Sequence, residues 1–407
     1  SFTLQPGLPL VIAESRCESG VQRMTLRQQR YTLQDPATPA QQWQVPVSYR
    51  STNAPKVEKL LLGEAAEIST PRCGEAIKLN AGAIGYYRVE YGEHAWRALE
   101  RVVKTLEPAD RANLIADAWA LAEAGRTGPE RFFRLAEGLT AGASRVERES
   151  LTRVIDLLDY LQVGQEGSED FRLYAISLLR PLLDQLGWLE RSGETEEAGL
   201  LRVQAVRRLG RLGDAQVIEQ ASERFAAFLK RPTSLRPYLR NTVINLVASH
   251  CDQATCDAIL GMARKARTLG EARRYYLALA HALDASTAAR TLDLVLHDKI
   301  PPPLVAAMIT TVAVEHPLLA WNFARANFQA LEAIVGPTFA SALPAILPTL
   351  PEGALALRLL DDFAPVHRTP AGRIQAARAR ARIALNAELR ERLLPRVDSW
   401  VISRAER

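Results

Sequence analysis

The sequence predicts an α+β chain of more than one domain, in which a small antiparallel β-sandwich over residues 1–91 precedes a large all-α superhelix over residues 92–407. In the first part, apolar and polar residues alternate in short runs separated by clusters of Gly, Pro and Asn, which is typical of sandwich strands. From about residue 92 onward, apolar residues recur at intervals of three and four, as on the buried face of amphipathic helices.

The strand signal falls in several short runs. Leu8–Ala13 is apolar, and Val21–Leu33 and Gln42–Tyr49 alternate between apolar and polar residues. Pro46 lies inside the third run and has no amide hydrogen to donate, which favours an edge position for that strand. The last strands of the sandwich are expected at Leu61-Leu62 and Ile77–Asn80.

The helical signal begins with a stripe of Trp96, Leu99, Val102, Val103 and Leu106. Asp110 is expected to cap a helix over Arg111–Ala124, and Gly125 to end it. Thr369-Pro370 has the form of an N-cap followed by proline at the first helical position, before the last long helices. Successive short helices over roughly 300 residues indicate an α-solenoid of the HEAT or armadillo kind, with a degenerate repeat.

Charge and hydropathy exclude two kinds of partner. The chain has 51 Lys and Arg against 46 Asp and Glu, a net charge of +5, and its arginines are interleaved with acidic residues along helices. A nucleic-acid surface needs a clustered basic stripe with aromatic platforms, so no nucleic-acid partner is expected. No apolar run approaches the length that crosses a bilayer, so no membrane partner is expected. No basic-then-apolar leader opens the sequence, which carries little weight if the sequence is part of a longer protein.

The residues that bind metals or perform nucleophilic catalysis are not arranged as those sites require. None of the six histidines is followed by Glu, and no two of them lie four residues apart, so the His-Glu-x-x-His zinc motif is absent. Cys251 and Cys256 are five residues apart on helical sequence and are expected to be small buried thiols. Cys17 and Cys73 lie in the same β region, and whether they pair in an oxidising compartment stays open. No catalytic residue and no metal ligand is therefore predicted in this chain.

The segment Asn80–Tyr91, which reads Asn-Ala-Gly-Ala-Ile-Gly-Tyr-Tyr-Arg-Val-Glu-Tyr, joins the strand region to the helical region. It resembles the Asn-x-x-x-x-Gly-Tyr-Tyr-Arg-Val-x-Tyr segment of the M1 zinc aminopeptidases, in which a β-sandwich meets a C-terminal helical domain. Earlier stretches are also similar to that family in order. They are Gln5–Val11, Gln28–Tyr31 and Trp43–Val47.

The resemblance continues along the helical region. Asp110–Gly125, Leu186-Gly187-Trp188 and Ala320–Phe328 resemble successive family segments. Asn327-Phe328 stands where the family has Asn-Trp, and the loop before Leu186 is short, which leaves the fine substrate preference open. The resemblance spans nearly the whole chain. It is to the region that follows the catalytic half in M1 aminopeptidases of the aminopeptidase N and puromycin-sensitive type, and the sequence resembles bacterial members of that family.

The resemblance implies a role in peptide catabolism without catalysis by this chain. M1 enzymes remove single N-terminal residues with a zinc ion and a glutamate-rich anchor for the free amine, and both belong to a catalytic half not represented here. The helical domain would cap that site and bind the distal part of the peptide. Its partners would be peptides and the N-terminal catalytic domains, in the cytoplasm or periplasm of a bacterium. The rival hypothesis is an α-solenoid adaptor that binds protein partners and has no peptidase activity.

Candidate residues follow from the motif and from charge. Tyr86, Tyr87, Arg88 and Tyr91 are expected to pack at the domain seam. Asp110 and Asp117 lie seven residues apart on one helix face, where a cap and a salt bridge, either on the helix surface or at the seam, are expected rather than paired catalytic carboxylates. Guanidinium groups bind carboxylates in bidentate geometry, so helix arginines are candidates for holding the C-terminus of a peptide, with solvated surface positions as the alternative for any one. These candidates are Arg273, Arg274, Arg373, Arg378 and Arg382.

Overall fold

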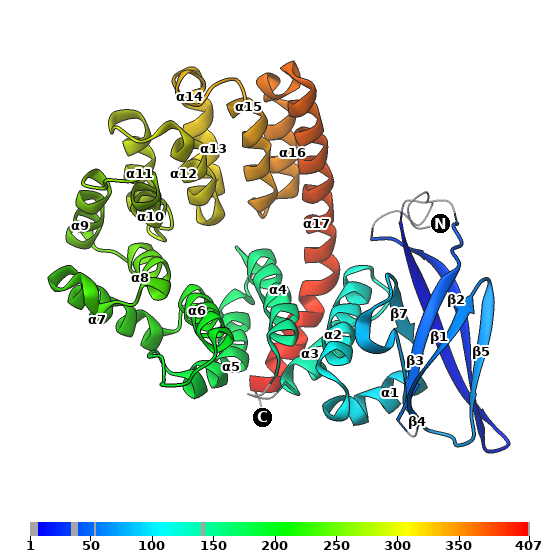
Figure 1. Cartoon of the computed structure of the whole chain (residues 1–407). Helices are drawn as coiled ribbons and strands as arrows, with labels where there is room; N and C mark the ends of the chain where they lie inside the picture. The colour runs from blue at the N-terminus through cyan, green and yellow to red at the C-terminus, as the bar shows by residue number, and fades with distance from the viewer. Residues whose placement is uncertain (1–6, 34–39, 53, 140–142, 406–407) are drawn as a thin grey trace. The chain divides into compact units, whose positions relative to one another are not determined.

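The computed structural model describes residues 7–33, 40–52, 54–139 and 143–405 (Figure 1). The chain divides into two compact units, of which the first comprises Ser1–Leu158 with Arg392–Arg407 and the second Asp159–Glu391. The strands end at Tyr91 and the helices begin at Glu93. The division at residues 91 and 92 therefore marks the change of secondary structure, and as a division into domains it stays a prediction.

The strands of the first unit form two sheets, ordered β5-β2-β1-β7 and β4-β3-β6. Their bounds are β1 Leu8–Glu18, β2 Val21–Tyr31, β3 Val45–Ser51, β4 Ala54–Leu62, β5 Ala65–Thr70, β6 Ile77–Leu79 and β7 Arg88–Tyr91. The predicted runs are thus found, although β5 and β7 were not foreseen as strands. Gln5 and Pro6, which open the first family-like motif, lie outside the described residues.

The core of the first unit comes from alternating strand positions. Met24 and Leu26 of β2 and Val45 and Val47 of β3 are fully buried, and the residues between them are more exposed. Gln28 of β2 holds the segment that leads into β3, because its side-chain amide donates to the carbonyl of Trp43 over 2.7 Å and accepts from the Trp43 amide over 2.9 Å.

The prediction of a wholly antiparallel sandwich is wrong in one place. β7 runs parallel to β1, with Leu10 opposite Arg88 and Ala13 opposite Tyr91. Parallel neighbours need a long crossover connection, and here the other strands of both sheets lie between β1 and β7 in the sequence. The remaining strand pairs are antiparallel.

The edge position expected from Pro46 is also wrong, since β3 is the central strand of its sheet. Pro46 lies opposite Leu61 of β4, but β6 pairs only with the far end of β3, from Tyr49 to Ser51. Pro46 therefore has a strand neighbour on one side only, which is the setting in which a strand tolerates proline.

The helices of the first unit are α1 Glu93–Val102, α2 Pro108–Glu123, α3 Glu130–Glu137 and the first part of α4 Arg145–Gln162, with short 3-10 turns at Ala81–Ala83 and Val103–Thr105. Gly125 follows α2 with a φ of 71°, which confirms the predicted stop. The end of α17 completes this unit: Arg392 donates to the last carbonyls of α2, those of Ala122 over 2.8 Å and Glu123 over 2.6 Å.

The second unit contains the rest of α4 and a run of short helices joined by short loops. They are α5 Ser168–Leu186, α6 Glu196–Arg211, α7 Ala215–Lys230, α8 Pro237–Ser249, α9 Gln253–Arg264, α10 Leu269–Leu279, α11 Ala285–His297, α12 Pro302–Glu315, α13 Pro317–Ala326, α14 Phe328–Val335, α15 Phe339–Ala342, α16 Gly353–Asp361 and the first part of α17 Pro370–Ala405. Short 3-10 turns occupy Pro232–Ser234, Leu343–Thr349 and Ala364–Arg368.

Many helices of the second unit pack on helices close to them in sequence. α8 contacts α6, α7 and α10, and α12 contacts α10, α11 and α13. The Oγ1 of Thr369 accepts the amide hydrogen of Gly372 over 3.0 Å, which confirms the predicted cap of α17. Among the described residues no single helix has the length and apolarity to span a bilayer; the segments Phe328–Val335 and Phe339–Thr349 pass that test jointly but are bent by 106°.

All four cysteines form disulfides. Cys17, near the end of β1, is bonded to Cys73, with the two Cα atoms 5.6 Å apart, which answers the question left open by the sequence. Cys251 is bonded to Cys256, so the expectation of two buried thiols is wrong. The physical reason is that Cys251 precedes α9, whose N-cap is Asp252, and the turn before the helix brings the two Cα atoms to 5.5 Å.

Candidate functional site

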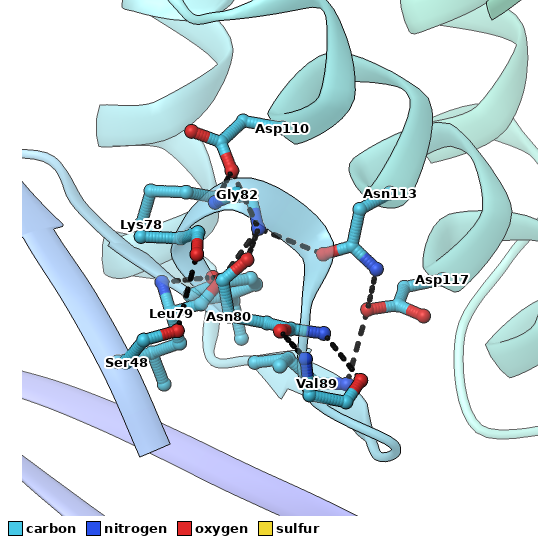
Figure 2. Close-up of polar contacts among 12 residues, drawn as sticks. Ser48, Lys78, Leu79, Asn80, Gly82, Val89, Asp110, Asn113 and Asp117 are labelled. Atoms are coloured by element: carbon cyan, nitrogen blue, oxygen red, sulfur yellow. Dashed lines mark hydrogen bonds and ion pairs between the residues drawn. The ribbon is translucent and has the colours of Figure 1, made fainter. Parts of the chain in front are cut away.

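A buried polar network joins the β6–β7 connection to helix α2 in the first unit (Figure 2). Lys78 of β6 is 2% exposed, and its ammonium group donates to the side-chain oxygen of Asn113 over 2.7 Å and to the carbonyl of Asn80 over 3.4 Å. It also donates to the carbonyl of Leu79. All three hydrogens of the buried ammonium group thus have an acceptor within reach, which a buried lysine requires.

Asp110 faces the same ammonium group and does not cap its helix as predicted. Helix α2 begins at Pro108 with Glu107 as its N-cap, so Asp110 lies within the first turn. Its carboxylate is 1% exposed, lies 3.9 Å from the Lys78 Nζ and accepts the amide hydrogen of Gly82 over 2.7 Å. The positive end of the helix dipole also stabilises a carboxylate at this position.

Asp117 holds the other end of the network. It lies two helical turns after Asp110, so both carboxylates face the β6–β7 connection. The Asp117 carboxylate accepts from Arg88 over 3.0 Å, from the amide of Val89 over 3.2 Å and from Asn113 over 3.3 Å. Of the two kinds of salt bridge that the sequence left open, the one at the junction of strands and helices is formed, between Asp117 and Arg88.

Burial shifts the proton affinities of these groups. Desolvation lowers the pKa of Lys78 from 10.5 to about 8, against the opposing pull of the Asp110 and Asp117 charges. Desolvation likewise raises the pKa of Asp117, and the Arg88 charge offsets part of that rise. Two carboxylates, Asp110 and Asp117, face two cations, Lys78 and Arg88, so the network is electrically balanced. These four residues, together with Asn80 and Asn113, are called the clasp below, and their balance is typical of a structural element rather than of an acid–base pair.

The four seam residues of the motif differ in their surroundings. Tyr87 and Tyr91 are 4% and 2% exposed, and the hydroxyl of Tyr91 accepts the amide hydrogen of Leu79 over 2.8 Å. Arg88 is partly exposed and pairs with Asp117. Tyr86 is 69% exposed, so the expectation that it packs like the other two tyrosines is wrong. The reason is local: Gly85 and Asn80 turn the chain so that Tyr87 occupies the buried position.

The arginines chosen from the sequence lie on two helices of the second unit. Arg273 and Arg274 belong to α10, and the other three belong to the first turns of α17, which Figure 1 shows well separated from α10. The structure therefore does not bring the five together. Arg274 donates to Asn241 over 2.6 Å, and Arg373 donates to the carbonyl of His367 over 3.0 Å.

The remaining three of those arginines are exposed. Arg382 is close enough to Tyr160 to lower the pKa of its hydroxyl, although burial raises that pKa overall. Arg273 and Arg378 make no hydrogen bond or ion pair with any residue that the structure describes. Those two guanidinium groups are the ones able to receive an external carboxylate without breaking an existing contact.

A different pair of arginines, Arg172 and Arg211, does converge, and no sequence motif predicted it. Asp159, 1% exposed at the end of α4, accepts from Arg172 over 2.8 Å and from Arg211 over 3.3 Å. Arg211 also reaches Glu315 of α12 over 3.6 Å. These residues are far apart in sequence, so their spacing could not predict the contact. The one sequence feature that points to it is the aspartate at position 159 within an apolar helical stripe.

The Leu186-Gly187-Trp188 segment proves to be a helix end held by a buried arginine. Arg202 of α6 is fully buried and donates to the carbonyls of Gly187 over 2.8 Å and Leu186 over 3.1 Å, while it pairs with Glu194. Gly187 has a φ of 65°, a left-handed conformation that favours glycine after a helix. This segment is structural rather than a candidate site for a ligand.

The zinc ion that the resemblance implies does not fit the residues of this chain. The described residues include no group of three His, Cys, Asp or Glu side chains that could hold a metal ion. The cysteines, which would be the strongest zinc ligands, are all in disulfides.

Comparison with known proteins identifies the family. A family model of the ERAP1-like C-terminal domain matches residues 76–385, which begins just before β6 and includes the whole clasp. The chain is 28% identical over 287 residues to the puromycin-sensitive aminopeptidase of Caenorhabditis elegans, across 67% of this chain and 30% of that protein. It is 23% identical over 358 residues to endoplasmic reticulum aminopeptidase 2 of Bos taurus, across 81% of this chain and 36% of that protein.

The chain belongs to the ERAP1-like C-terminal domain family and corresponds to the C-terminal region of an M1 aminopeptidase. Glutamyl aminopeptidase of Rattus norvegicus is another relative, 25% identical over 353 residues, across 81% of this chain and 36% of that protein. The chain thus spans about a third of the length of these relatives. The three are animal proteins and give no support for the bacterial origin suggested by the sequence.

Proposed function

We propose that this chain is the non-catalytic C-terminal region of an M1 zinc aminopeptidase, which caps the catalytic site and encloses the distal part of a peptide while its N-terminal residue is removed. The observation that carries the proposal is the match of the ERAP1-like C-terminal domain to residues 76–385. The relatives are named as aminopeptidases, and this chain spans about a third of each. Catalysis and its zinc ion are therefore assigned to a region outside this sequence.

The packing of the second unit supports a cap. Helices that each contact their near neighbours in sequence, as α8, α10 and α12 do, are typical of α-solenoids, which present one extended concave face. A wall of that kind beside a catalytic centre excludes water and positions the substrate. The HEAT or armadillo-like superhelix predicted from the sequence is part of this proposal.

The C-terminal carboxylate of a peptide needs a cationic partner within such a cap. Arg273 of α10 and Arg378 of α17 are the strongest candidates among the five arginines, because both are exposed and neither is held by a described residue. Arg274, Arg373 and Arg382 are weaker candidates, since each already has a neighbour that it contacts or influences.

The proposal is tested by steady-state kinetics on the complete polypeptide that contains this chain. Arg273→Glu and Arg378→Glu are compared with Arg101→Glu, which reverses the charge of an exposed arginine on α1 in the first unit. At least one of the two cap variants is expected to raise the KM for long peptides with a free C-terminus. Single-residue arylamides should be hydrolysed at the normal rate, because they do not reach the cap.

Two results would contradict the proposal. Equal losses on long peptides and arylamides would indicate damaged packing rather than a lost carboxylate contact. A complete wild-type polypeptide that releases no N-terminal residue from any peptide would favour the adaptor function instead.

A further inference from the structure

The connection between β6 and β7, residues 80–87, exposes two large apolar side chains. Ile84 is 73% exposed and Tyr86 is 69% exposed. Gly82 and Ala83 beside them are exposed too, so the tip of this loop is an apolar surface with no charged residue of its own. Single exposed apolar residues are ordinary on protein surfaces, but two in one short loop suggest an interaction site when the loop is rigid.

The backbone of this loop is rigid. Asn80 and Ala83 have φ values of 54° and 55°, a left-handed conformation that non-glycine residues adopt only when their surroundings enforce it. The Asn80 side chain enforces it by binding both backbone groups of Gly85: it accepts the amide hydrogen over 2.7 Å and donates to the carbonyl over 3.1 Å. The buried carboxylate of Asp110 fixes the amide of Gly82 (Figure 2).

The packing beneath the loop keeps the two apolar side chains in place. A Cβ atom on Gly85 would lie 2.2 Å from a ring carbon of Tyr87 and 3.0 Å from the Asn80 side-chain oxygen. The buried Tyr87 ring therefore lies against the backbone between Ile84 and Tyr86. The loop cannot collapse to bury its apolar residues without disrupting the clasp below it.

A rigid apolar surface loses little conformational entropy when it binds a partner, and tyrosine is enriched among the residues that dominate binding at interfaces. We infer that the loop of residues 80–87 docks into an apolar pocket of the catalytic region of the same aminopeptidase. This inference rests on the proposed function. The loop lies inside the ERAP1-like match that begins at residue 76, and the relatives extend over about three times the length that the chain aligns with.

The inference is tested by hydroxyl-radical footprinting, which measures the solvent exposure of side chains by mass spectrometry. The 407-residue chain is compared with the complete polypeptide that contains it. The modification rate of Ile84 and Tyr86 is expected to fall several-fold in the complete polypeptide. Leu61 of β4, which is 64% exposed in the same unit, is the control and should keep its rate.

A second measurement uses the double variant I84S/Y86S of the complete polypeptide, with L61S as its matched control. The double variant is expected to lose arylamide hydrolysis at a lower temperature than wild type, because the catalytic region loses a contact, and L61S is not. Both changes affect exposed side chains, so the chain itself should fold normally.

The outcomes separate this inference from the function on which it rests. An active complete polypeptide in which Ile84 and Tyr86 keep the modification rate of the 407-residue chain overturns the inference alone. An inactive complete polypeptide overturns the proposed function, and the inference falls with it. Protection that appears in the 407-residue chain as its concentration rises would assign the loop to self-association and would also overturn the inference.

Discussion

The ammonium nitrogen of Lys78 lies 3.9 Å from a carboxylate oxygen of Asp110, and both side chains are 2% exposed or less. The pair links the last strand before the exposed loop to the first turn of α2, and Asp117 with Arg88 repeats the arrangement one strand later. The two ion pairs, of which that of Lys78 and Asp110 is fully buried, therefore fix the junction between the sheets and the helices. They also hold the loop of residues 80–87 that we propose as a docking surface.

Lys78→Met is expected to destabilise the first unit by about 1–3 kcal/mol, because it leaves the buried carbonyls of Leu79 and Asn80 and the side-chain oxygen of Asn113 without their donor. The control is Arg97→Met, which removes an exposed pair with Glu93 and should cost less than about 1 kcal/mol. Hydrogen exchange of peptides from β6 and α2 in increasing urea measures the two losses. Equal losses for the two variants would show that the buried pair has no special role.

The stability of the first unit should rise with pH between about 8 and 10, because burial lowers the pKa of Lys78 from 10.5 to about 8. In that range the unfolded chain binds more protons at this residue than the folded chain, so the free energy of unfolding increases with pH, by about 2 kcal/mol in total. Lys78→Met should remove this increase. Above pH 10 the tyrosines oppose it, because burial raises the pKa of Tyr31 and Tyr87 to about 12.

The measurement is urea unfolding of wild type and Lys78→Met at several pH values from 7 to 10, in which the difference between the two proteins isolates the lysine. A wild-type stability that changes with pH in parallel with that of Lys78→Met would contradict the prediction.

Gly85→Ala should destabilise the first unit by about 1–3 kcal/mol, since the added methyl group has no room beside the Tyr87 ring. Gly199→Ala is the matched control: a Cβ atom there meets nothing within 4 Å, and the position lies inside α6. That change should stabilise the second unit by about 0.4–1 kcal/mol, because alanine favours a helix. Thermal unfolding of the two variants decides the sign, and a stabilising Gly85→Ala would contradict the geometry of the loop.

The two disulfides should contribute unequally. Cys17–Cys73 closes a loop with a sequence separation of 56, and Cys251–Cys256 one with a separation of only 5. Chain-entropy arguments give about 4 kcal/mol for the first and about 2 kcal/mol for the second. Paired Cys→Ser variants, followed by urea unfolding, measure both contributions, and a larger loss at Cys251–Cys256 would contradict this order.

The positions of strands and helices were predicted well from the sequence, because both leave short periodic patterns of apolar residues. The strand runs and the amphipathic stripes reappear, and the caps at Gly125 and Thr369 are where they were expected. The parallel pairing of β7 with β1 was missed because strand direction depends on a crossover that no local pattern records. The disulfide at Cys251 was missed because its formation depends on where α9 begins.

The polar contacts of the clasp were harder to foresee than its position. The Asn80–Tyr91 motif marked the junction, and the salt bridge of Asp117 was expected. Lys78 stood in a short apolar strand with nothing to indicate a fully buried ammonium group. Its burial depends on the carbonyls of Leu79 and Asn80, which follow it directly, and on the side-chain oxygen of Asn113, which α2 brings to it from 35 residues further along the chain. Arrangements of that kind follow from tertiary packing and are not encoded by spacing along the chain.

The most direct test of the account is zinc stoichiometry measured together with arylamide hydrolysis. The purified 407-residue chain is expected to hold no tightly bound zinc and to release no arylamine, because its sequence contains no His-Glu-x-x-His motif and its described residues offer no metal-binding group. The complete polypeptide is expected to bind one zinc ion and to be active. One tightly bound zinc ion in the 407-residue chain, or hydrolysis by that chain alone, would contradict the claim that it is the non-catalytic part of an aminopeptidase.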